Sequence, residues 1–350
     1  MLRKDLFKKK LSVDSTRNGF GRGLVKVGSD KDVWCLTADL GGSTCVNDFK
    51  KKFSDRFVQV GVAEQNLVTV SSGIASMDKV VFATSFAAFS PGRNWEQIRT
   101  TICYNDQPVV VVGSHTGLGV GEDGATHQAL EDVALMRALP NMCVVVPCDV
   151  IQAQKATIAL AKQKKPAYLR IHRQKSPVLT KVSSNFKIGE AQVFKDGSDV
   201  VIFSSGPIIF EALKAAIELK KQRISVAVVN IHTIKPLDEK TIIKYAKKCG
   251  VFLTLEDHQI NGGLGSAISE CLSKKYPVKG DFVGVNDSFG ESGKAEELFW
   301  KHGLTSNRVI TKVKALLKAK KVINKKSKKC VVKKAGYKKG VVSKKRVKKK

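Results

Sequence analysis

Acidic, aromatic and histidine side chains with catalytic potential lie in three polar clusters of this 350-residue chain. In the first, Glu64 stands at the start of a helix predicted over 63–77, where a carboxylate either complements the helix dipole or takes part in chemistry. In the second, Phe86 and Phe89 are three residues apart and precede a Pro-Gly turn. Such a pair either packs in a core or, when exposed, forms a platform for a flat ring. Both clusters therefore leave a structural and a functional interpretation open.

The third cluster is a glycine-rich loop over 113–128, with five glycines and two histidines in sixteen residues. Glycine allows a backbone to approach a ligand closely. His115 and His127 flank Asp123, and this combination favours a binding or catalytic role over a purely structural one. A metal site is the alternative. The spacing lacks the short His-x-His and HExxH patterns, so we predict no metal ligands here.

The elements that position these clusters form an alternating pattern. Apolar β-branched runs end in polar residues and then give way to helical periodicity, which is typical of a parallel sheet covered by helices. Open α/β sheets bind ligands at the carboxyl ends of their strands, where all three clusters fall. Strands are predicted over 33–38, 57–61, 80–85, 109–114, 143–147 and 167–171, and helices over 63–77, 92–103, 127–139 and 149–163. Another helix begins near residue 15, with Asp14 or Ser15 as its cap.

A second α/β unit follows an aperiodic linker over 175–190. Its predicted strands are 200–205, 224–231, 251–257 and 281–288, and its helices are 210–222, 238–250, 294–303 and one starting at Thr305 or Ser306. The fold class is therefore α/β, with two parallel-sheet domains. We predict a basic leader over 1–10, a first domain over 11–180, a second over 190–310 and a tail over 311–350.

The charge is distributed unevenly along the chain. The formal net charge is +30, and residues 311–350 hold 18 Lys, one Arg and no acid. Such a segment is predicted to be disordered, and it could bind nucleic acid through its lysines or simply be solvated. The sequence shows no signal peptide and no membrane-length apolar run. Eight cysteines without a CxxC pair favour a reducing, cytoplasmic setting.

The motifs GVAEQN, TSFAAFSPGRNWEQIR and GEDGATHQALEDVALMRALPN agree in order and spacing with one family. Together they resemble the pyrimidine-binding domain of transketolases, which use thiamine diphosphate. The resemblance covers roughly residues 10–310 and is greatest to split transketolases, whose two halves are separate chains. It implies a pyrimidine-binding domain followed by a transketolase C-terminal domain, and transfer of a two-carbon ketol unit from a ketose phosphate to an aldose phosphate in the pentose phosphate pathway.

The resemblance also implies roles for individual residues. Glu64 would activate the aminopyrimidine ring, and His127 would lie near the reacting carbonyl; these are the two catalytic candidates. The implied cofactor-binding residues are Asp39, Leu40, Glu64, Phe86 and Phe89. The implied substrate-binding residues are Arg17, Ser43, His115, Asp123, His127 and Arg173. Two guanidinium groups, a hydroxyl and an imidazole suit a phosphate dianion.

The chain departs from full-length transketolases in one respect. It has no GDG motif, with which the family holds the diphosphate through Mg²⁺. The resemblance therefore implies a GDG-bearing partner subunit that supplies the magnesium ligands, in a two-plus-two assembly, with a homodimer when the chain is alone. Deoxyxylulose-phosphate synthase and the 2-oxo-acid dehydrogenase β-subunit are related alternatives, which GEDGATHQ and the phosphate-binding residues disfavour. A nucleic-acid-binding protein and a catalytically idle subunit are the alternatives from other classes, and Glu64 and the histidines argue against the idle subunit.

Overall fold

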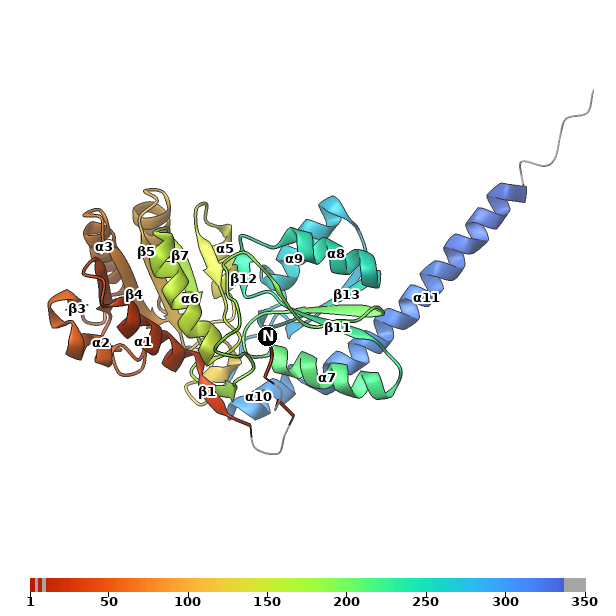
Figure 1. The fold of residues 1–350 in the computed structure, drawn as a ribbon, viewed down its shortest axis with the longest axis horizontal. Helices are drawn as coiled ribbons and strands as arrows, with labels where there is room; N and C mark the ends of the chain where they lie inside the picture. Colours follow the sequence, from red (N-terminus) through yellow and green to blue (C-terminus); the bar gives the residue numbers. More distant parts are fainter. Residues whose placement is uncertain (4–5, 8–10, 337–350) are drawn as a thin grey trace, which may run out of the picture.

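The computed structural model describes residues 1–3, 6–7 and 11–336, with side chains up to residue 322. Two helix-covered sheets lie next to each other, the first built mainly from the N-terminal half and the second from the C-terminal half (Figure 1). The first sheet has the strand order β12-β6-β7-β5-β4-β2-β3. Its strands are β2 (Val33–Thr37), β3 (Phe57–Gln59), β4 (Val80–Phe86), β5 (Val109–Ser114), β6 (Cys143–Val145), β7 (Ala167–Arg170) and β12 (Thr233–Lys235).

The central strands of this sheet are apolar on both faces because helices cover both sides. All four valines over 109–112 are buried, for example. The helices of this half are α1 (Thr16–Val27), α2 (Asn47–Lys52), α3 (Glu64–Ala75), α4 (Trp95–Gln97), α5 (Asp132–Ala138) and α6 (Val150–Gln163). A π-helical turn over Ile98–Cys103 continues α4. Ser15 caps α1 by accepting a hydrogen bond from the Asn18 backbone N–H, as the sequence allowed. Gly19 lets α1 approach α6, since a Cβ there would lie 2.1 Å from the Val150 carbonyl oxygen.

The second sheet has the order β14-β13-β10-β11-β9. Its strands are β9 (Gln192–Lys195), β10 (Val200–Ser204), β11 (Val226–Asn230), β13 (Val251–Gln259) and β14 (Lys279–Val285). It is covered by α7 (Ile209–Lys221), α8 (Glu239–Cys249), α9 (Leu264–Lys275), α10 (Ala295–Lys301) and the start of α11 (Ser306–Gly336). The two-domain α/β fold is thus confirmed.

Two antiparallel edge strands depart from the prediction of purely parallel sheets. β9 pairs antiparallel with β11, and β12 pairs antiparallel with β6. β12 comes from the second half of the chain yet completes the first sheet, so the sheets do not divide at the linker. Its three residues are too short a run to show β periodicity in the sequence. The predicted linker also contains β8 (Lys175–Pro177), which pairs with β1 (Val13–Ser15).

The N-terminal residues that the structure describes are packed against the domains. Leu6 is buried in the core of the second domain, and the ring of Phe7 stacks on Phe210 at 5.9 Å. Leu2 forms a β-bridge with Thr180. The segment predicted as a basic leader therefore contributes apolar contacts as well as charge.

The last helix begins before residue 311 and continues into the segment predicted as a disordered tail. α11 continues to Gly336 and projects away from the domains (Figure 1). Val309, Val313 and Leu316 are buried on one face of α11, because residues three and four apart share a helix face. Lysine and alanine both favour helix, which disorder reasoning from charge alone overlooked. Residues 337–350 lie outside the described residues. In the described part of the chain, no helix has the length and apolar character that a membrane span requires.

Candidate functional site

Glu64 lies in the first turn of α3, at the carboxyl edge of the first sheet. Only 1% of the residue is exposed. Its carboxylate accepts a hydrogen bond from the Arg93 guanidinium at 2.9 Å, and the Ser85 hydroxyl lies at 3.5 Å. The Asn94 side-chain amide donates to the Glu64 backbone carbonyl at 2.7 Å. The acid is thus enclosed and held in place by groups that follow β4.

Four rings gather beside this carboxylate. The rings of Phe86 and Phe89 lie 6.2 Å apart and nearly parallel. His115 stacks on Phe86 at 3.8 Å, and the His127 ring meets Phe89 edge-on at 5.3 Å. Both phenylalanines are only half-buried. Their exposure favours the platform interpretation over the core interpretation.

The glycine-rich loop that carries both histidines is anchored by the second domain. The Asp257 carboxylate, on β13, accepts a hydrogen bond from the Leu118 backbone N–H at 3.0 Å. Gly117 lies directly against this carboxylate, and a Cβ at Gly117 would be 2.0 Å from the Asp257 Oδ2 atom. The Gln128 side chain donates to the Glu291 backbone carbonyl at 3.0 Å. The second domain therefore supports the loop on which His115, Asp123 and His127 lie.

A buried ion pair of the first domain also contacts the second domain. The Arg170 guanidinium, at the end of β7, contacts the Asp132 carboxylate at 2.8 Å, and both side chains are almost fully buried. Arg170 also donates to the Asp257 backbone carbonyl at 2.9 Å. The Tyr168 hydroxyl donates to Asp132 at 2.6 Å. A buried charge is tolerated only with such partners, so this network fixes β7 against β13.

Two of the predicted phosphate-binding residues, Arg17 and Arg173, line a groove of about 450 Å³. Lys175 and Lys294 add two cations to its lining, and Glu122 and Glu296 add two acids. Arg17 donates to the Ser43 backbone carbonyl at 3.0 Å. Arg173 forms an ion pair with Asp123 at 3.2 Å, and each side chain is about 40% exposed. The structure thus brings Arg17, Ser43, Asp123 and Arg173 to one edge of the sheet.

His115 lies close to both the rings and the arginines. Burial, together with the charges of Arg17 and Arg173, lowers the pKa of His115 to about 3. Its ring nitrogen Nδ1 is 2.9 Å from the Ser114 hydroxyl. In the free chain, therefore, this imidazole is neutral at ordinary pH and can exchange hydrogen bonds without adding positive charge.

Asp39 and Leu40 follow β2 at the same edge of the sheet. Asp39 is exposed and adopts a positive φ of 59°. Its backbone N–H donates to the Gln59 side-chain oxygen at 2.7 Å, and Gln59 donates back to the Asp39 carboxylate at 3.2 Å. Among the described residues, no hydrogen bond or ion pair joins Asp39 or Leu40 to the Glu64 cluster. These two residues therefore form a separate part of the predicted site.

Comparison with known proteins identifies the family. Two family models match, namely transketolase, pyrimidine binding domain, over residues 14–178, and transketolase, C-terminal domain, over residues 189–309. A protein of Methanocaldococcus jannaschii named as a transketolase C-terminal section is 40% identical over 301 residues, covering 85% of this chain and 94% of that protein. The chain belongs to the transketolase family.

Two further relatives are subunits of divided transketolases. A 6-deoxy-6-sulfo-D-fructose transketolase subunit from Clostridium sp. (strain MSTE9) is 37% identical over 281 residues, covering 80% of this chain and 87% of that protein. A solved structure of a split gene transketolase, an inactive β4 tetramer, matches with a TM-score of 0.80 and 38% identity, covering 87% of this chain and 98% of that one. The chain thus corresponds to the C-terminal section of a split transketolase, as the motifs predicted.

Thiamine diphosphate is the cofactor that the transketolase family implies, and the described residues suit one end of it. A buried carboxylate beside half-buried aromatic faces can take a flat heterocycle with hydrogen-bonding nitrogens. Within the described ranges, no group of three or more His, Cys, Asp or Glu residues could hold a metal ion. The fit therefore concerns the aminopyrimidine and not the metal-bound diphosphate.

Sequence reasoning missed four residues that contact the candidate site or line its groove. Arg93 stands inside the quoted motif SPGRN, so its charge was visible but its partner was not. Lys175 follows Arg173 by two residues, a signal that could have been used. Lys294 and Asp257 come from the second domain, and no local pattern connects them to the first.

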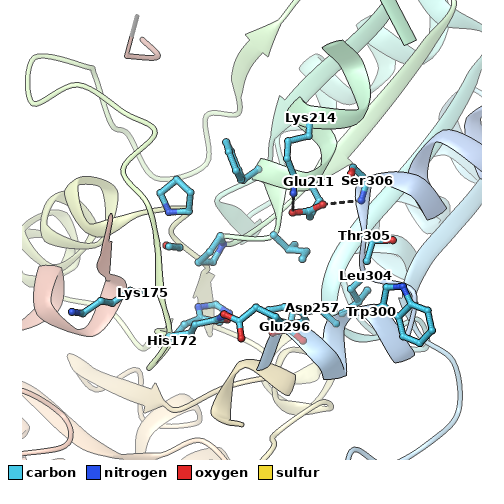
Figure 2. Close-up of a pocket in the computed structure, with 17 residues that line it drawn as sticks. His172, Lys175, Glu211, Lys214, Asp257, Glu296, Trp300, Leu304, Thr305 and Ser306 are labelled. Carbon is cyan, nitrogen blue, oxygen red and sulfur yellow. Dashed lines mark hydrogen bonds and ion pairs between the residues drawn. The ribbon is translucent and has the colours of Figure 1, made fainter. Parts of the chain in front are cut away.

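Another cavity, of about 400 Å³, lies between the domains (Figure 2). Its lining includes His172 from the first domain and Asp257, Glu211, Lys214 and Trp300 from the second. None of the residues predicted for cofactor or substrate lines this cavity. It adjoins the groove of Arg17 and Arg173, because Gln174, Lys175 and Glu296 line both.

Proposed function

We propose that this chain is one half of a thiamine-diphosphate-dependent transketolase that moves a two-carbon ketol unit from a ketose phosphate to an aldose phosphate. One observation carries the proposal. The buried Glu64 carboxylate, the Phe86–Phe89 platform and the groove containing Arg17 and Arg173 lie along one sheet edge. This arrangement supports a site with a flat cofactor ring at one end and a phosphate at the other.

When bound, the cofactor supplies the nucleophilic carbon that carries the two-carbon unit. Glu64 shares a proton with the aminopyrimidine, because a buried carboxylate beside a weakly basic ring nitrogen favours proton sharing. Phe89 and Phe86 would hold the aminopyrimidine ring, and Asp39 and Leu40 would hold the thiazolium end.

The substrate is held by groups with fixed roles. Arg17 and Arg173 bind the phosphate through charge-assisted hydrogen bonds, with Ser43 and the neutral His115 as further donors. His127, whose ring meets Phe86 and Phe89 edge-on, moves a proton at the substrate carbonyl or hydroxyl. Asp123 leaves Arg173 to bind a substrate hydroxyl.

The diphosphate and Mg²⁺ belong to a GDG-bearing partner subunit in this proposal. Support comes from the absence of a GDG sequence in the chain and from the likeness to proteins named as subunits or sections of transketolases. Two copies of each chain would form the active assembly, with this chain forming a homodimer when alone. The seven described cysteines are free thiols, which suits a cytoplasmic enzyme of the pentose phosphate pathway.

The test is reconstitution from purified subunits. Ketol transfer between sugar phosphates is measured with thiamine diphosphate and magnesium, using this chain with and without the GDG-bearing chain. We expect turnover only in the mixture, and Glu64→Ala should abolish it. The variant chain should still fold, because the Arg93 side chain that would lose its partner is 54% exposed and can be solvated. Full activity of this chain alone would refute the divided site. Near-normal rates for Glu64→Ala would refute the proposed cofactor site.

A further inference from the structure

The Arg93 guanidinium lies where the proposed function places a cofactor ring. Its centre is 4.9 Å from the centroid of Phe89, over the face of that ring. At the same time, one of its nitrogens donates to the Glu64 carboxylate at 2.9 Å. A single side chain of the protein therefore uses both the aromatic platform and the buried acid.

A guanidinium and an aminopyrimidine share the features that such a position recognises. Each is flat and delocalised, and each presents a π face to an aromatic ring. Each also directs N–H groups from its edge, the aminopyrimidine when its ring nitrogen is protonated. The same face of Phe89 and the same oxygen of Glu64 cannot serve both groups at once, so one must leave when the other binds.

The structure indicates which group moves. Glu64 is 1% exposed on its side chain, whereas the Arg93 side chain is 54% exposed. The backbone around Arg93 is fixed, since its N–H donates to the Phe89 carbonyl at 2.8 Å and the neighbouring Asn94 bonds to the Glu64 carbonyl. Rotation of the Arg93 side chain into solvent would therefore open the position without moving the backbone.

We propose that Arg93 occupies the aminopyrimidine position of the free chain and is displaced when the cofactor ring binds. This inference rests on the proposed function. It accounts for a buried carboxylate in a chain without cofactor, since an unpaired buried charge would be strongly unfavourable. Arg93 thus neutralises the buried charge of Glu64 until the cofactor ring replaces it. It weakens cofactor binding because it competes for the same contacts.

The experiment measures binding of the isolated aminopyrimidine to the full chain. The probe is 4-amino-5-hydroxymethyl-2-methylpyrimidine, titrated by ligand-observed NMR. We expect Arg93→Ala to bind it at least tenfold more tightly than the unaltered chain, and millimolar guanidinium to compete with it in that variant. Arg93→Lys, which keeps the charge but loses the flat group, should give a smaller gain. Arg99→Ala, an exposed arginine six residues further along, is the matched control and should bind like the unaltered chain.

The remaining results test this inference separately from the proposed function. Equal or weaker binding by Arg93→Ala, no detectable binding by it, or no competition from guanidinium would overturn the inference. An active reconstituted enzyme alongside any of these results would leave the proposed function standing. If Glu64→Gln in the Arg93→Ala background leaves a tight pyrimidine complex unchanged, the proposed contact between Glu64 and the ring is wrong. If Arg93→Ala does not fold, Arg93→Lys replaces it, provided that its thermal unfolding is near-native. Arg93→Lys should then bind the probe more tightly than the unaltered chain, and equal or weaker binding would overturn the inference.

Discussion

The neutral state of His115 changes how the phosphate end of the site should be understood. Sequence reasoning placed this imidazole with two guanidinium groups as a dianion site. Burial and those same two arginines lower the pKa of His115 to about 3, so the positive charge in the free chain comes from the arginines. His115 contributes direction through hydrogen bonds, and its affinity for a proton should rise only when an anion binds beside it.

The lowered pKa of His115 predicts a pH dependence of stability. The unfolded chain binds this proton below a pKa of about 6.5, whereas the folded chain does not do so until about 3. The unfolded state therefore gains protons first as the pH falls, and stability falls with it. The contribution at pH 5 is about 2 kcal/mol by this linkage. Urea unfolding of His115→Asn should show a smaller loss of stability from pH 7 to pH 5 than the unaltered chain. An identical pH dependence would contradict the assignment.

Arg173 gives a second prediction at the level of single residues. Arg173→Ala should raise the Michaelis constant for sugar phosphates by an amount equivalent to about 1.5–3 kcal/mol, the contribution of one charge-assisted hydrogen bond. The same variant should change the constant for unphosphorylated sugars much less. Lys294→Ala is the comparison variant, because Lys294 is an exposed cation that lines the same groove. Equal effects on phosphorylated and unphosphorylated sugars would show that Arg173 does not contact phosphate.

Among the elements, the contact between the glycine-rich loop and β13 has the clearest consequence. Gly117 has a φ of 71° and a ψ of −171°, a conformation that is essentially restricted to glycine. It also touches the Asp257 carboxylate, so it has no room for a side chain. The C-terminal domain thereby supports the loop that carries residues of the candidate site.

Gly117→Ala should be destabilising and should also impair substrate binding. Strain alone predicts a loss of about 1–3 kcal/mol, to which displacement of the Asp257 carboxylate adds. Thermal unfolding and sugar-phosphate affinity are the two measurements. The matched control is Gly73→Ala in α3, where a Cβ would meet nothing within 4 Å and helix propensity predicts a gain of roughly 0.5–1 kcal/mol. Similar stability for the two variants would show that the loop does not require its glycine.

Local sequence patterns were sufficient to predict most of the strands and helices and the polar clusters that follow the strands. The three clusters follow β3, β4 and β5, and they lie at the carboxyl edge of the first sheet as predicted, because parallel strands bring their carboxyl ends to one edge. The pairing of Arg93 with Glu64, and the anchoring of Leu118 by Asp257, are contacts between residues 29 and 139 positions apart. Contacts between residues so far apart in the chain leave no periodic pattern in the sequence, so they could not be predicted from it. β12 was missed for the same reason, since its pairing with β6 is purely tertiary.

At the level of the whole molecule, the start of α11 belongs to the second domain. Val313 and Leu316 are buried, and the Lys312 ammonium pairs with Asp281 at 2.9 Å. The lysine-rich composition over 311–350 had suggested a single tail. The boundary between packed and projecting helix instead lies near residue 321, because Lys320 still donates to the Cys249 carbonyl at 2.7 Å.

Two truncations test this boundary. Removing residues 322–350 should leave the melting temperature and reconstituted activity unchanged. Removing residues 312–350 should destabilise the fold by several kcal/mol, since burying a Val or Leu side chain contributes about 1.5–3 kcal/mol. Equal stability of the two truncated chains would contradict the packed role of α11. Any affinity of the full chain for RNA or DNA should be lost in both truncations and should weaken steeply with salt.

The shared strand β12 also affects how the protein is made. β6 ends at Val145, but the strand that covers its open edge is Thr233–Lys235. Roughly 90 residues must be synthesised between them, which takes about 5–20 seconds at usual elongation rates. During that interval the nascent first domain presents an unpaired β-edge, the kind of surface on which strands of other chains add. Completion of the first domain on the ribosome therefore depends on the second domain having begun.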